Sequence, residues 1–102
     1  MIQLSNGAKV HAAFIQPASP GMKPNGVVFA ETETDWCTWS IYWDGDSTMD
    51  DTDEGLTHEV WEAETGYYYQ KSDPGAQRLA QLNFGFRLGG MLLPTMKERI
   101  FP

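Results

Sequence analysis

The chain has 102 residues, of which 41% are hydrophobic and 13% aromatic, and its formal net charge is −7 at pH 7. This length predicts a single domain over residues 1–102, and the apolar content is too high for a disordered acidic tail. The negative charge argues against a protein that binds nucleic acid or an anionic membrane directly, because both need a basic surface.

The first predicted element is a β-hairpin over residues 2–16. A three-residue loop at 6–8 places Leu4 opposite Val10 on an apolar face. Gly7 supplies the positive φ that such a loop needs. We therefore expect the first two strands to be neighbours in the sheet.

Two further strands follow a proline-rich loop at residues 16–25. Residues 27–33 form the first, and residues 37–43 form the second, in which apolar and polar side chains alternate. The connection at 34–36 is short enough for an antiparallel hairpin. Trp39 and Trp43 share the apolar face, so we expect them in the core.

Residues 44–55 form a polar, acidic loop, and residues 57–70 are open to two interpretations. Leu56, Val60 and Ala63 fit one helical stripe. The aromatic run at 67–69 favours a strand instead. We expect a strand over 65–70 and leave residues 57–64 undecided.

One helix is well marked. Its start is predicted at 72–74, where Ser or Asp can cap it and Pro suits the first turn, and its end at the glycines of 89–90. Leu79, Leu82 and Phe86 lie at spacings i, i+3 and i+7, which predicts that they face the sheet.

The order of these elements predicts an α+β fold. We expect an antiparallel β-sheet of about four to five strands with one main α-helix packed on one face. Residues 91–93 are a candidate for a short edge strand.

Charge is sorted along the chain. Twelve of the 14 acidic residues lie between Glu31 and Glu64, and no Lys or Arg occurs between Lys23 and Lys71. All four tryptophans fall in the same segment. A surface of one sign that also carries aromatic anchors is typical of a site for a basic partner.

We therefore predict a partner-binding site in this segment. Its ion-pairing residues are Asp44, Asp46, Asp50, Asp51, Asp53 and Glu54, and its aromatic anchors are Trp36, Tyr42 and Trp61. Two alternatives stay open: the loop is solvated and has no role, or the helix covers Trp36 and Tyr42.

The sequence favours no metal site, cofactor or catalytic residue. The acidic loop fails the EF-hand spacing of glycine and glutamate in every frame. Cys37 could act as a nucleophile with His11 or His58, but its place in a strand and the surrounding negative charge favour a buried, unreactive thiol. A single cysteine forms no internal disulfide, which gives no sign of an oxidising compartment.

A strand ending in Cys37-Thr38-Trp39, a strand ending in Gly66-Tyr67-Tyr68-Tyr69, and an Ala/Leu-rich helix closing on Phe84 and Arg87 follow one another over residues 27–88. This order resembles small uncharacterised α+β proteins of phages and plasmids. The resemblance implies a mobile-element origin and a compact sheet-plus-helix fold. It brings no catalytic residues.

We expect a non-enzymatic binding protein that docks its acidic, aromatic surface on a basic, nucleic-acid-binding protein. By analogy with small acidic phage proteins that imitate the charge of DNA, it would inhibit a host defence nuclease complex. The alternatives are a structural or assembly protein that forms a homo-oligomer, and a cation-binding module built on the 44–55 loop. With no signal-peptide pattern and no long apolar run, we expect a cytoplasmic protein.

Overall fold

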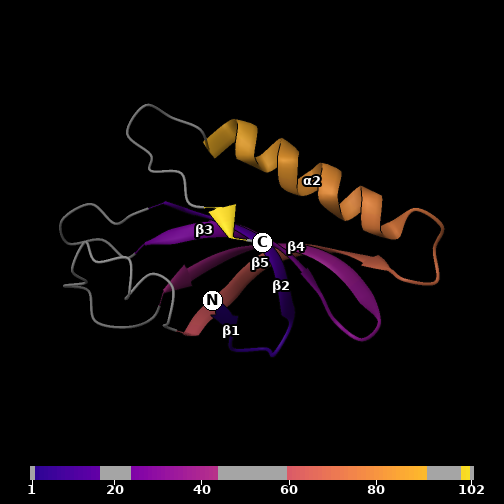
Figure 1. Ribbon diagram of the computed structural model, residues 1–102, viewed down its shortest axis with the longest axis horizontal. Helices are drawn as coiled ribbons and strands as arrows, with labels where there is room; N and C mark the ends of the chain where they lie inside the picture. Colours follow the sequence, from indigo (N-terminus) through magenta and orange to yellow (C-terminus); the bar gives the residue numbers. More distant parts are fainter. Residues whose placement is uncertain (1, 17–23, 44–59, 92–99, 102) are drawn as a thin grey trace.

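The computed structural model describes residues 2–16, 24–43, 60–91 and 100–101 (Figure 1). The fold is α+β, with one helix packed against a curled sheet that forms a half-barrel. In chain order the elements are β1 (Gln3–Leu4), β2 (Lys9–Gln16), β3 (Asn25–Glu31), β4 (Asp35–Trp43), β5 (Val60–Gln70), α2 (Ala76–Met91) and β6 (Ile100–Phe101).

The sheet is mixed, so the prediction of a purely antiparallel sheet is wrong. Its strands lie in the order β1-β5-β4-β3-β2-β6 in the described residues. Each strand runs antiparallel to its neighbours except β1, which runs parallel to β5. The α+β class and the single helix on a sheet are confirmed.

The predicted hairpin over residues 2–16 is also wrong. β1 does not pair with β2; Ser5 donates its backbone N–H to the carbonyl of Trp61 on β5 at 2.9 Å. Ile2 and Leu4 are buried, as their alternation predicts. Alternation fixes which side chains share a face, but it does not say which strand lies alongside.

β1 and β2 leave an open seam in the half-barrel. A cavity of about 350 Å³ lies there, with Ile2, Leu4, Ala8 and Val10 in its lining. Gly7 has a φ of 77° in the turn between the two strands, so the positive φ predicted for it is confirmed.

The main core lies inside the curl of the sheet. β4 supplies Cys37, Trp39, Ile41 and Trp43 to it, which confirms the alternation predicted for residues 37–43. Ile2, Leu4, Ala13, Ile15, Val28, Ala30 and Trp61 complete this cluster. We call this side of the sheet the inner face and the opposite side the helix face, because α2 packs there (Figure 1).

α2 is rotated relative to the prediction. Leu79, Leu82 and Phe86 point away from the sheet and are exposed, so the prediction that they face it is wrong. Ala76 and Ala80 are buried instead. Small side chains at these two positions let the helix approach the sheet closely, which leaves the larger ones outside.

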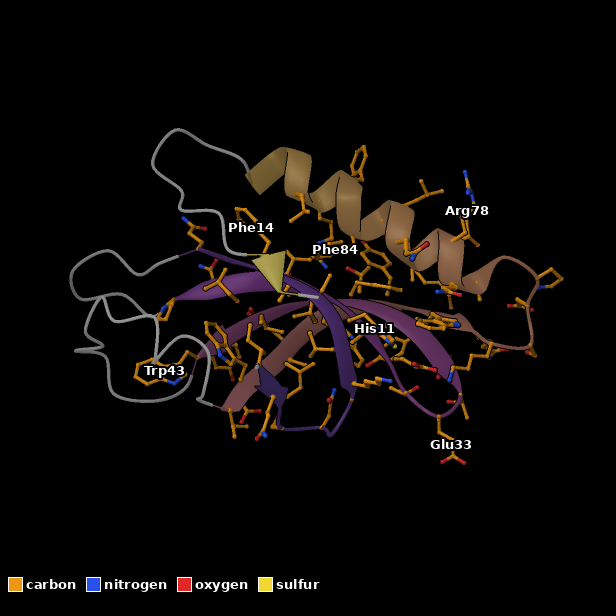
Figure 2. All side chains as sticks on the ribbon, in the orientation of Figure 1. His11, Phe14, Glu33, Trp43, Arg78 and Phe84 are labelled. Atoms are coloured by element: carbon orange, nitrogen blue, oxygen red, sulfur yellow. The ribbon has the colours of Figure 1, made fainter. Side chains whose placement is uncertain are left out.

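Phe84 extends the buried side of the helix. Figure 2 shows its ring between α2 and the sheet, and its centroid lies 6.5 Å from that of Phe29 on β3. Val27 and Phe29 lie on the helix face of β3. Arg78 points away from the sheet in the same view.

The ends of α2 differ from the prediction by a few residues. Leu79 donates its N–H to the carbonyl of Gly75 at 2.9 Å, so Gly75, with a φ of 80°, lies at the start of the helix, and Pro74 precedes it. The helix continues through 89–90 to Met91, which removes Met91 from the predicted edge strand; residues 92–93 lie outside the described part.

β5 settles part of the ambiguity at residues 57–70. Val60–Gln70 is a strand, which confirms the strand predicted at 65–70 and excludes the helical alternative from Val60 onward. Residues 57–59 lie outside the described part of the chain.

Candidate interaction surfaces

The six carboxylates predicted for ion pairing, from Asp44 to Glu54, lie outside the described residues. Five other acidic residues of the segment are described. Glu31, Glu33 and Asp35 lie at the turn between β3 and β4, and Glu62 and Glu64 lie on β5. Figure 2 shows Glu33 at the tip of that turn.

Trp36 lies far from the end of β4. It is near the start of this strand, and Trp43 is the last residue of the strand, directly before the loop begins in the sequence. The two residues are seven positions apart, which is about 23 Å at the rise of a β-strand. Trp36 and Tyr42 therefore lie toward opposite ends of β4.

Trp36 belongs to an aromatic cluster on the helix face. Its ring stacks on Phe29 with centroids 5.4 Å apart, and it lies 5.2 Å from the ring of His11. The Nζ of Lys71 lies 5.5 Å from the centre of the Trp36 ring. These contacts leave Trp36 half-buried.

Glu31 contacts two residues of this cluster, His11 and Lys71. Its carboxylate lies 2.7 Å from Lys71 Nζ and 2.8 Å from His11 Nε2. The hydrogen bond from Lys71, followed by that from His11, lowers the pKa of Glu31 from its ordinary value of 4.5. One of the twelve carboxylates thus has its compensating charge within the fold.

Tyr42 and Trp61 differ in how deeply they are buried. Tyr42 is half-buried near the end of β4 and pairs with Glu62 across β5, so it lies at the end of the sheet where the acidic loop begins. Trp61 has 0% exposure inside the curl. The prediction that Trp61 is a surface anchor is wrong, because the parallel pairing of β1 covers the start of β5.

Cys37 is buried on the inner face, as expected. Burial, and secondarily the charge of Asp35, raises its thiol pKa to about 11. A cysteine nucleophile needs a lowered pKa and access to its substrate. His58, one of its two candidate partners, lies outside the described residues.

The described residues contain no group of three or more His, Cys, Asp or Glu side chains placed to hold a metal ion. The loop considered for a cation lies outside them, so that alternative stays a prediction. Nor does this part of the chain include a helix with the length and apolar character needed to cross a membrane.

A cavity that the sequence gave no reason to expect opens between α2 and β5. It has a volume of about 430 Å³ and is lined by Gly66, Tyr67, Asn83, Phe86 and Arg87. Arg87 donates from Nη2 to Ser40 Oγ, while its Nη1 and the Oδ1 of Asn83 are buried without a hydrogen-bond partner in the described structure. The i, i+4 spacing of these two polar residues was the available sequence signal.

Exposed apolar side chains surround this cavity. Phe86 is 84% exposed and Tyr67 58%. Leu79 and Leu82 extend the exposed surface along α2. Because these side chains lie on neighbouring elements, they form an apolar surface, which marks a site of protein contact more often than single exposed residues do.

No protein-family model, curated protein or solved structure matches this chain. Its function is therefore argued from its own residues.

Proposed function

We propose that this chain is a small, non-enzymatic binding protein that docks its acidic segment, residues 31–64, on a basic surface of a partner protein. One observation carries the proposal: twelve carboxylates fall in this segment, and no Lys or Arg lies between Lys23 and Lys71. So much charge of one sign repels itself, and an oppositely charged partner relieves that repulsion.

The described contacts support this proposal. Lys71 and His11 bind Glu31, but Glu33 and Glu64 are exposed on the surface. Glu62 accepts a hydrogen bond from the hydroxyl of Ser5 at 2.6 Å, which leaves its charge in place. Among the described residues, Glu33, Glu62 and Glu64 thus keep their charge for a partner.

The exposure of each aromatic side chain decides whether it can anchor a partner. Tyr42 lies next to the start of the acidic loop and keeps part of its surface, so we assign it the anchoring role. Trp36 is assigned a structural role in its aromatic cluster. The loop carboxylates from Asp44 to Glu54 would supply steering and ion pairs.

A nucleic-acid-binding protein is the partner class that fits a chain of this charge. Its basic groove evolved to receive phosphates, and a row of carboxylates can occupy the same groove. In its most specific form, the proposal is that the chain inhibits a defence nuclease complex in the cytoplasm of a host cell.

The test is capture of host proteins on the tagged chain, followed by displacement with duplex DNA. We expect a basic, nucleic-acid-binding protein that is released by high salt, because exposed charges are screened over about 8 Å at physiological ionic strength. DNA should displace it by competing for the same groove.

The matched variant replaces the six loop acids by their amides, and a control replaces Asp73 and Glu98, the two acids outside the segment, in the same way. The first should lose the captured protein, and the second should keep it. Capture that is insensitive to salt, or equal for both variants, would overturn the electrostatic mechanism.

A further inference from the structure

The outer edge of β5 lacks a neighbouring strand over most of its length in the described structure. β4 pairs with β5 from Trp61 to Gln70, whereas β1 pairs only with Val60 and Trp61. An unpaired strand edge presents backbone N–H and C=O groups that can accept another strand.

The direction of these backbone groups follows from the register. Lys71 donates its N–H to the carbonyl of Thr34 at 2.9 Å, and hydrogen-bonded pairs alternate with non-bonded pairs along an antiparallel ladder. Tyr69 and Tyr67 therefore direct their backbone groups toward β4. Gly66, Tyr68 and Gln70 direct theirs outward.

The edge is limited at one end by a β-bulge. The register shifts between Trp39 and Ile41 of β4, which pair with Gly66 and Ala63, so Glu64 and Thr65 together oppose a single residue. The regular part of the free edge begins at Gly66.

The side chains on this edge are exposed and aromatic. Tyr67 lies on the helix face beside Phe86, at the cavity between β5 and α2. Tyr68 lies on the inner face, where its ring meets the indole of Trp39 edge-on, with centroids 5.6 Å apart. An uncharged, aromatic edge of this kind favours addition of a strand over solvation.

We propose that a second copy of this chain pairs with the β5 edge, antiparallel, about a two-fold axis at Tyr68. The two Tyr68 residues then exchange two backbone hydrogen bonds, and the N–H of Gln70 in each copy donates to the carbonyl of Gly66 in the other. Tyr67 of each copy lies on the helix face, beside Phe86.

Self-complementarity identifies a second copy as the occupant. A two-fold interface must match a surface with itself, and the segment from Gly66 to Gln70 does so without any charge. The two chains, each at −7, thus meet at an uncharged strip.

In this register the ladder ends at Gly66 and Gln70 of each copy, so Glu64 and the bulge lie outside it. Lys71 also lies outside it and keeps its contact with Glu31. A shift of register would bring the bulge or the charge of Lys71 into the ladder.

The dimer should be reversible. A ladder of about five residues is short compared with interfaces that bury roughly 1,200–2,000 Å². Tyr67 and Phe86 add apolar area on the helix face. This inference does not depend on the acidic docking proposed above, because the two surfaces use different residues.

Sedimentation equilibrium from about 1 µM to about 1 mM tests the association. We expect the mass to rise from that of one chain toward that of two. Tyr68→Lys places two positive charges across the axis and should raise the dissociation constant by at least about tenfold. Gln77→Lys adds the same charge on an exposed position of α2 and should leave it unchanged.

A crosslink tests the register. Tyr68→Cys places two thiols at a hydrogen-bonded pair, where Cα atoms lie about 5.5 Å apart, within the range that a disulfide spans. Mild oxidation should give a covalent dimer, whereas Gln77→Cys should not. Thermal melts of both variants establish that they are folded.

Three results would overturn the proposal: a monomer at every concentration, a dimer that Tyr68→Lys does not weaken, or equal crosslinking of the two cysteine variants. Capture of a different protein that only Tyr68→Lys abolishes, without dimer formation, would assign the edge to a strand of another partner and would also overturn it.

Discussion

The indole of Trp39 occupies the space where a side chain at position 66 would begin. A Cβ on Gly66 would overlap Cδ1 of the Trp39 ring, which is itself buried in the core. Position 66 on β5 therefore has to be glycine because of a residue 27 positions earlier on β4, its direct neighbour in the register.

Gly66→Ala should destabilise the fold by about 2–3 kcal/mol, because the added methyl group displaces a tryptophan that has no free space around it. Urea unfolding measures this change. Gly85→Ala is the matched control: a Cβ there meets open space on α2, and the change should stabilise the protein by up to about 1 kcal/mol. If both variants changed stability alike, the overlap with Trp39 would not be the cause.

A double-mutant cycle isolates the contact. Trp39→Leu is costly on its own because it leaves a cavity. In that background Gly66→Ala should cost much less, since the methyl group then fills part of the vacated space. Additive effects would contradict the proposed contact.

The strands of the centre of the sheet could be predicted from the sequence, because a period of two in residues 37–43 admits a single assignment of faces. The partner of β1 could not. Ile2 and Leu4 are buried equally well beside β5 or beside β2, and the choice depends on Trp61, a residue far away in the sequence.

The buried face of α2 could not be predicted from the sequence for the same reason. Leu79, Leu82 and Phe86 form one stripe with helical spacing, and Ala76, Ala80 and Phe84 form another. Hydrophobicity favours the first, but Phe84 meets Phe29 and Arg87 meets Ser40 on the sheet, and these contacts select the second. The burial of Trp61 at the candidate site could not be predicted either. It follows from the pairing of β1 with β5, and the residues next to Trp61 in the sequence do not reveal that pairing.

The orientation of α2 can be tested by two substitutions. Leu82→Ala should change stability by no more than about 0.5 kcal/mol, because Leu82 is exposed. Ala80→Leu should cost about 1–3 kcal/mol, because Ala80 is fully buried against the sheet. Thermal unfolding compares the two. If Leu82→Ala cost more stability than Ala80→Leu, the stripe of Leu79, Leu82 and Phe86 would face the sheet.

Glu31 should make stability depend on pH. Its pKa is lowered in the folded chain by Lys71 and His11, so its contribution is complete above its ordinary value of 4.5 and is lost as the pH falls through the lower folded value. Glu31→Gln should therefore reduce stability at pH 7, and the difference from the parent chain should shrink at about pH 3. Glu33→Gln removes the same charge from the exposed tip of the turn and should show a smaller change at pH 7. A difference for Glu31→Gln that is independent of pH would contradict the ion pairs.

Cys37 should be protected from thiol reagents in the folded chain. Its pKa is raised from 9.0 to about 11, so at pH 8 the folded protein holds about a hundredfold less thiolate than the unfolded chain, in addition to the barrier that burial imposes. Labelling with a chromogenic disulfide at pH 8 should be slow in buffer and fast in urea, and the slow rate should follow the opening of the fold. Destabilisation by Gly66→Ala should accelerate it, whereas Gly85→Ala should slow it. Rapid labelling of the folded parent chain would show that the inner face is open to solvent, and it would remove the argument against a reactive thiol.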